Sequence, residues 1–221
     1  MAESIWLRGD ERPRRPRLSR ERVVAAAVAL LDAEGVTGFS MRALAARLKA
    51  GTMSLYEYVT SRDDVLDLAL DEVIGEVELP GDEPWRDLLT AQLVRTRQVM
   101  RRHQWAPALA ATRPLLGPNA LARSERFYAA LAGAGLSGPE LVAAVGTLSS
   151  YVNGFVAAEN TWRAAVRTPS AESELRERTA RHLERHRPGL ASLAQVRIDD
   201  FDAQFRLGLD LVLDGVQARL R

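Results

Sequence analysis

The chain has 221 residues, with 30 Lys or Arg against 29 Asp or Glu and no cysteine. This length supports a buried core, and a hydrophobic content of 47% excludes an intrinsically disordered chain. The lack of cysteine excludes disulfide scaffolds, thiolate catalysis and thiolate metal sites, and it fits a reducing compartment. No continuous apolar stretch follows the first charges, so we expect no signal peptide and a cytoplasmic protein.

Basic charge is concentrated at the N-terminal end. Residues 1–62 carry 11 basic and 7 acidic side chains, whereas the remainder carries 19 and 22. Residues 1–18 are expected to form a flexible basic arm, in which the prolines between Arg12 and Arg17 favour an extended backbone. Such an arm either follows DNA phosphates or the minor groove, or it is a solvated tail.

The segments after residue 18 have apolar residues at three- and four-residue spacing, which predicts an all-α fold. Ser19 is a suitable N-cap for a first helix that Gly35 ends, and Ser40 for a second, two-turn helix. A turn over 49–51 and a short helix over 52–58 follow, with Leu55 and Val59 facing inward. Two short helices joined by a tight turn, between longer helices, are typical of a helix-turn-helix.

A further helix is expected from Ser61 toward Val77, and Pro80-Gly81 closes this first unit. The sequence thus predicts a DNA-binding domain over 19–79 and a larger helical domain over 80–221. Proline and glycine residues divide the second domain into helices at about 83–102, 105–111, 117–133, 138–164, 171–187 and 199–220.

The predicted short helix over 52–58 carries side chains suited to reading DNA. Thr52, Met53, Tyr56 and Glu57 lie opposite its apolar side and offer a hydroxyl, apolar contact for a thymine methyl, and a carboxylate acceptor for cytosine N4. Tyr56 and Tyr58 are alternatively packing aromatics. However, two turns of helix cannot bury both tyrosines together with their apolar neighbours, so at least one should face DNA.

The segment from Ser40 to Leu66 resembles the TetR family of bacterial transcription regulators. The family pattern is matched by Ser40, Arg42, Leu44, Ala45, Leu48, Leu55, Tyr56, Tyr58, Val59, Arg62 and Asp63. The chain departs from it at Lys49 and Ala50, where a Gly-Val turn is usual, which can change the turn geometry and the tilt of the recognition helix.

The resemblance implies a set of DNA contacts. We expect phosphate contacts from Arg42 and Arg62, the alternative being solvated surface arginines. The full set of expected DNA-binding residues is Ser40, Arg42, Thr52, Met53, Ser54, Tyr56, Glu57, Tyr58 and Arg62.

Residues 83–221 resemble, more weakly, the ligand-binding and dimerisation domain of the tetracycline-repressor-like branch. The resemblance implies a homodimer in which a small-molecule effector changes the spacing of two DNA-reading heads. The half-sites of its operator would lie about one DNA turn, or a multiple, apart.

The predicted helix over 138–164 has two distinct sides. Its small residues, with apolar residues of the last helix, are expected at a dimer interface: Gly146, Ser150, Gly154, Phe205, Leu209, Val212 and Val216. The aromatic side and other aromatic or sulfur-containing residues are expected to line a ligand pocket: Met100, His103, Trp105, Phe127, Tyr151, Phe155, Glu159 and Trp162. The alternative is that these aromatics fill a core. Glu159, as the only charge on this side, favours a cationic or hydroxylated ligand.

Other functions have weaker support in the sequence. The uncharged run over 141–158 approaches the length of a membrane span, but polar residues and glycines interrupt it, so a soluble helix is expected. His182 and His186 lie among arginines that would repel a metal cation, and no metal or cofactor is expected. Without a nucleophile elbow, P-loop or dinucleotide motif, we expect no enzyme. The competing hypothesis is a helical enzyme or interaction protein with an incidental helix-turn-helix. We expect a ligand-responsive dimeric repressor that binds a palindromic operator.

Overall fold

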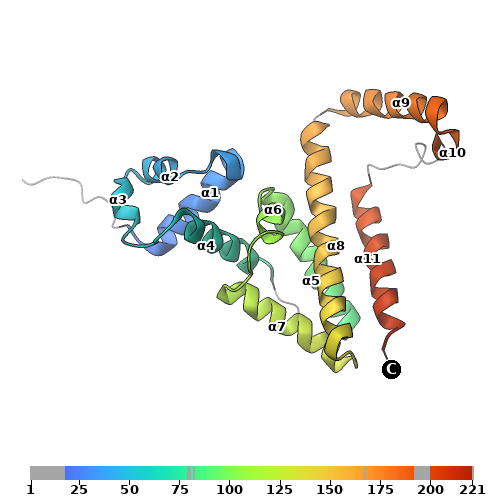
Figure 1. Ribbon diagram of the computed structural model, residues 1–221, viewed down its shortest axis with the longest axis horizontal. Coiled ribbons are helices and arrows are strands. Elements are labelled where there is room, and N and C mark those ends of the chain that lie inside the picture. Colours follow the sequence, from blue (N-terminus) through green and yellow to red (C-terminus); the bar gives the residue numbers. More distant parts are fainter. Residues whose placement is uncertain (1–17, 79–80, 82, 167, 192–199, 221) are drawn as a thin grey trace, which may run out of the picture.

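The computed structural model describes residues 18–78, 81, 83–166, 168–191 and 200–220. Across these ranges the chain forms helices and no strands, which confirms the all-α prediction. The helices are α1 (Arg20–Gly38), α2 (Met41–Leu48), α3 (Thr52–Leu55), α4 (Arg62–Gly75), α5 (Trp85–Arg102), α6 (Ala106–Ala110), α7 (Pro118–Gly133), α8 (Gly138–Ala165), α9 (Pro169–His186), α10 (Pro188–Ala191) and α11 (Phe201–Gln217). Helices α1–α4 form a compact head, and α5–α11 form a larger body (Figure 1). The N-terminal arm lies outside the described residues, apart from Leu18.

Serine caps begin three helices of the head. The hydroxyls of Ser19, Ser40 and Ser61 each accept a hydrogen bond from the backbone N–H three residues later, at 3.3, 3.2 and 3.0 Å. The carboxylate of Asp64 in turn accepts a hydrogen bond from the N–H of Ser61 at 3.2 Å, which completes a capping box. Gly35 interrupts α1 with a φ of 67°. The three serine caps and the interruption at Gly35 agree with the helix starts and the helix end predicted from the sequence.

Helix α3 is shorter than predicted. It ends at Leu55, and the chain continues through hydrogen-bonded turns in which the N–H groups of Tyr58 and Val59 donate to the Leu55 carbonyl at 3.0 and 3.2 Å. Leu55 and Val59 are buried as predicted. In the recognition segment, residues 52–59, the two inward-facing side chains are therefore buried although the last turn is irregular.

Helix α8 is at the centre of the body and packs against α5, α6, α7 and α11. By length and composition it is apolar enough to cross a membrane. However, its buried residues include Glu159 and Asn160, and a bilayer would leave such groups without water. We therefore interpret α8 as a helix of the body that is buried along one side, and not as a membrane span, as the sequence predicts.

A buried ion cluster joins three helices of the body. The Glu159 carboxylate on α8 is fully buried and lies 2.8 Å from Nε of Arg97, 3.0 Å from Nε of Arg163 and 3.3 Å from Nε of Arg101. Arg97 also contacts Asp202 of α11 at 2.7 Å, and this hydrogen bond lowers the pKa of Asp202. The cluster therefore ties α5, α8 and α11 together, and each buried charge in it has a partner.

The substitution Glu159→Gln is expected to lower the free energy of unfolding by about 3 kcal/mol, because it removes the buried negative charge that Arg97, Arg101 and Arg163 share. Urea denaturation at a fixed protein concentration measures this change. The control is Glu172→Gln, which breaks an ion pair with Arg176 on the surface of α9 and should cost less than about 0.5 kcal/mol. Equal losses in the two variants would contradict the importance of the cluster.

The turn between α2 and α3 contains a strained residue. Lys49 has a φ of 53° and a ψ of 39°, the left-handed region that normally favours glycine. Its N–H donates to the carbonyls of Ala45 and Ala46, and the N–H of Ala50 donates to Ala45 at 3.0 Å. Lys49 therefore adopts, at the end of α2, the left-handed conformation that glycine commonly adopts at helix ends.

Replacing Lys49 by glycine is expected to raise the free energy of unfolding by about 0.5–1 kcal/mol, because glycine adopts this conformation without a clash of its Cβ atom. Thermal or urea denaturation gives the change. The variant Lys49→Ala removes the charge but keeps the Cβ atom and should show no gain. A gain in both variants would mean that the charge, and not the backbone, causes the strain.

Candidate DNA-binding and ligand-binding sites

The recognition segment presents a polar and apolar surface to solvent. Met53 is 78% exposed and Tyr56 43%, and Glu57 is also exposed, while Thr52 and Ser54 are half-buried. These side chains lie opposite the buried anchors of the segment, as the spacing predicts. The surface offers the hydrogen-bonding groups and methyl contacts that read base edges in the major groove.

Helix α2 adds groups suited to phosphate binding. Ser40 is exposed, and its Oγ accepts the bond that caps α2, which leaves the hydroxyl hydrogen able to donate to a phosphate. Arg42 is exposed and makes no hydrogen bond or ion pair with the described residues. Both side chains are therefore available to DNA, as expected.

Tyr58 and Arg62, two of the predicted DNA contacts, also make contacts within the head. The Tyr58 hydroxyl donates to the carbonyl of Leu18 at 2.9 Å. The guanidinium of Arg62 donates to the carbonyls of Val36 and Phe39, at 3.0 and 3.4 Å, and lies over the Phe39 ring. These contacts fix the recognition segment and α4 against α1 and the loop that follows it, so both residues position the head.

Helix α4 connects the head to the body through a row of aspartates. Asp63, Asp67 and Asp71 are four residues apart and share one face of the helix. Arg113, after α6, contacts Asp63 at 2.5 Å and Asp67 at 2.6 Å. The Asp71 carboxylate accepts hydrogen bonds at 3.3 and 2.9 Å from two backbone N–H groups in the first turn of α7. Asp71 therefore caps a helix of the body from a helix of the head.

His103 and Trp105, which the sequence placed in the pocket, also belong to this contact. The two ring nitrogens of His103 lie 2.8 Å from Oδ1 of Asp32 on α1 and 3.1 Å from Oε1 of Glu76 at the end of α4. The indole N–H of Trp105 donates to the same Asp32 oxygen at 2.7 Å. The turn after α5 lies against α1 and α4, which places these side chains between head and body.

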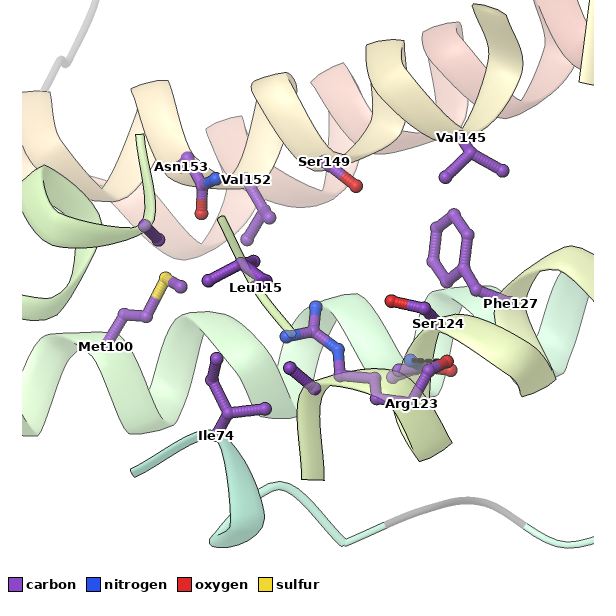
Figure 2. A pocket seen from close by; sticks show the side chains of 13 residues that line it. Ile74, Met100, Leu115, Arg123, Ser124, Phe127, Val145, Ser149, Val152 and Asn153 are labelled. Carbon is purple, nitrogen blue, oxygen red and sulfur yellow. Dashed lines mark hydrogen bonds between the residues drawn. The ribbon is translucent and has the colours of Figure 1, made fainter. Parts of the chain in front are cut away.

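The body contains a cavity of about 60 Å³ between α5, α7 and α8, reached also by the end of α4 (Figure 2). Of the predicted pocket residues, Met100 and Phe127 line it. The principal apolar side chains of the lining are Ile74, Met100, Leu115, Phe127, Val145 and Val152. Its polar side chains are Gln92, Arg123, Ser124, Ser149 and Asn153. A second cavity of about 260 Å³ shares Ile74, Leu115 and Ala120 with the first and extends between α4 and the start of α7.

The predicted aromatic residues of α8 do not line this cavity, because they lie on another side of the helix. Tyr151 and Phe155 pack against Phe205, with ring centroids 5.5 and 5.2 Å apart, and Glu159 belongs to the ion cluster. Trp162 is half-buried and is not part of the cavity lining. The side of α8 that faces the cavity carries Val145, Ser149, Val152 and Asn153, a helical repeat rotated from the aromatic one.

The polar residues of the cavity were not predicted from the sequence, although the spacing of two of them along α7 indicates that they face inward. Ala120, Phe127 and Leu131 form the buried stripe of α7. Arg123 and Ser124 lie three and four residues after Ala120 and therefore on the same side of the helix. A charged residue within an apolar stripe could have been identified as an inward-facing group.

The residues of the expected dimer surface differ in their exposure within a single chain. Gly146, Ser150 and Gly154 are exposed on α8, as a contact between copies requires. In contrast, Phe205, Leu209 and Val216 are at most 7% exposed within a single chain, and Val212 is half-buried. The large apolar side chains that α11 exposes are Leu207 and Leu211, at 65% and 66%. A groove of about 440 Å³ between α8 and α11 includes Leu211 and Val212 in its lining.

An exposed helix-turn-helix surface, joined through one helix to a body with an internal cavity, defines a DNA-binding regulator with a separate site for a small molecule. The comparisons agree with this class. A family model described as "Tetracyclin repressor-like, C-terminal domain" matches residues 78–220. The chain therefore belongs to the tetracycline-repressor-like, or TetR, family of transcriptional regulators, as the resemblance indicated.

Similar proteins cover nearly the whole chain. An HTH-type transcriptional regulator of Saccharopolyspora erythraea is 46% identical over 97% of this chain and 92% of its own length. The HTH-type transcriptional repressor DrrR1 of Streptomyces coeruleorubidus is 39% identical over 97% of this chain and 84% of its own. The crystal structure of the TetR family protein ActR of Streptomyces coelicolor, in complex with actinorhodin, is 31% identical, with a TM-score of 0.81 and coverage of 92% and 98%.

Loss of the interdomain cap should weaken the fold measurably. Asp71→Ala leaves backbone N–H groups of α7 without their acceptor and is expected to lower the free energy of unfolding by about 1 kcal/mol. Urea denaturation measures the change. Glu72→Ala, an exposed neighbour on α4, should change stability by less than about 0.5 kcal/mol. If the two variants were equally stable, the Asp71 cap would not contribute.

Proposed function

We propose that the protein is a cytoplasmic, homodimeric repressor that binds palindromic operator DNA through α2 and α3 and is released when a small molecule enters the cavity of the body. The observation that carries the proposal is that α4 is part of the DNA-binding head and also reaches the cavity of the body. It packs against α1 in the head, and its Ile74 lines the cavity. No catalytic step or cofactor is part of this function.

DNA binding is proposed for the exposed residues of the head. Ser40 and Arg42 are available for phosphates, and Thr52, Met53, Tyr56 and Glu57 for base edges, with Ser54 beside them. Tyr58 and Arg62 hold these residues in place. The division into a head over 19–79 and a body over 80–221 is part of this proposal.

Homodimer formation is proposed through α8 and α11. The small residues Gly146, Ser150 and Gly154 allow a second helix to approach closely, and Leu207 and Leu211 supply apolar area that a single chain leaves in water. Two copies joined in this way would present two recognition segments to half-sites about one DNA turn, or a multiple, apart.

Release is proposed to follow from the contacts of α4. Packed helices move between discrete arrangements and do not deform continuously, so a ligand that displaces α7 or the segment before it also displaces α4 through Asp71 and Arg113. The crystal structure of ActR with actinorhodin supports a small molecule as the effector. Ligand and DNA then weaken each other's binding by the same factor.

The experiment that tests this function is a gel shift with DNA from upstream of the protein's own gene, at two salt concentrations and with excess non-specific competitor. A shift that survives competitor is expected. Arg42→Ala should weaken binding and reduce the slope of log affinity against log salt by about one, because one phosphate contact is lost.

The matched control is Arg185→Ala, which removes an exposed arginine from α9 in the body and should leave both quantities unchanged. Unchanged affinity and slope in Arg42→Ala would overturn the phosphate assignment. If genome-wide selection of bound DNA found no preferred sequence, the proposed operator binding itself would fail.

A further inference from the structure

The cavity contains a cation without a counter-charge. Arg123 projects from α7, and Figure 2 shows its guanidinium directed into the cavity toward Leu115. Within the described part of the chain, no carboxylate or carbonyl oxygen accepts a hydrogen bond from this guanidinium. Burial without an opposing charge lowers the pKa of Arg123 to about 10, so the group is still charged at neutral pH.

Two other arginines withdrawn from solvent are paired with carboxylates. Arg97 faces Glu159 and Asp202, and Arg113 contacts two aspartates of α4. The Arg123 side chain is half-buried, and a partly desolvated cation without a counter-charge is the kind of group that is concentrated at binding sites. The missing partner of Arg123 therefore points to a ligand that supplies the negative charge.

Gln92 provides a second polar group without a partner. Its side chain is fully buried, and its Nε2 donates to the backbone carbonyl of Arg123 at 3.4 Å. Its Oε1 accepts no hydrogen bond from the described residues. A buried amide oxygen in this state requires a donor, such as a ligand hydroxyl. It is independent of the guanidinium and belongs to the same cavity.

The rest of the lining defines the body of the ligand. Met100, Phe127 and Val152 form apolar walls, and the flat ring of Phe127 suits stacking with another ring. Ser149 and Asn153 add hydrogen-bonding groups on the α8 side. The neighbouring cavity of about 260 Å³ shares Ile74, Leu115 and Ala120 with this one, so a ligand larger than the first cavity would have to displace these shared side chains.

We propose that the effector is a small aromatic monoanion whose carboxylate binds the guanidinium of Arg123, with a hydroxyl group donating to Gln92. This inference rests on the proposed function and adds the chemical class of its ligand. A carboxylate fits because it pairs with guanidinium through two parallel hydrogen bonds. The proposed ligand is negatively charged, whereas the sequence favoured a cationic or hydroxylated one. The difference arises because Glu159 lies in the ion cluster and not in the cavity.

The test compares acids with their neutral amides. Full-length protein is titrated calorimetrically with benzoate, 2-naphthoate and 9-anthracenecarboxylate, and with the carboxamide of each. For at least one ring size, the acid should bind about tenfold or more tightly than its amide. In Arg123→Gln this ratio should fall to about one.

Arg126→Gln is the matched control, because it removes the same charge from the same helix at a residue whose guanidinium donates to the carbonyl of Gly81, away from the cavity. It should keep the preference for the acid. Thermal unfolding checks the fold: ligand-free Arg123→Gln should melt no lower than the native protein. The preferred acid should raise the melting temperature of the native protein and of Arg126→Gln, but not that of Arg123→Gln. A preference that survives Arg123→Gln, or no preference at any ring size, would overturn the proposal.

Failure of this inference is distinguishable from failure of the proposed function, because the titration contains no DNA. Specific operator binding together with equal affinity for acid and amide would overturn only the assignment of Arg123. The expected acid preference together with no release of operator DNA would support Arg123 and overturn the release mechanism.

Discussion

The pairing of charge along one face of α4 is the interaction on which the rest of the structure depends. Asp63 and Asp67 hold Arg113, and Asp71 caps α7, so that one helix of the head is fastened at successive turns to the body. His103 adds a contact at the end of the same helix. Because these bonds are directional, they hold the head and the body in a defined arrangement, which the proposed release mechanism requires.

Two arrangements of buried charge have different consequences. The cluster around Glu159 is internally paired, and it joins α5, α8 and α11 into a rigid frame. Arg123 lies in the same domain without a partner, between apolar walls. A paired cluster stabilises one conformation, whereas an unpaired cation stabilises whatever anion reaches it. The body therefore combines a fixed frame with a site prepared for a charged ligand.

Local features were predicted well and contacts across helices poorly. The serine caps and the inward pair Leu55 and Val59 follow from interactions within four residues, and the sequence contains all of their partners. The aromatic residues predicted to line the pocket do not line the cavity, because one residue step rotates a side chain by about 100° around a helix. This rotation separates Tyr151 from the neighbouring Val152, which lines the cavity.

The sequence by itself determined the all-α class, the helix-turn-helix, the family and the exposed reading surface, because helix periodicity, capping and turn chemistry act between near neighbours. Only the tertiary structure decided that Glu159 is neutralised by arginines, that His103 contacts the head, and that Arg123 faces a cavity. Those outcomes depend on which helix faces are brought together. That choice is made by the packing of the whole chain and cannot be derived from the spacing within any one helix.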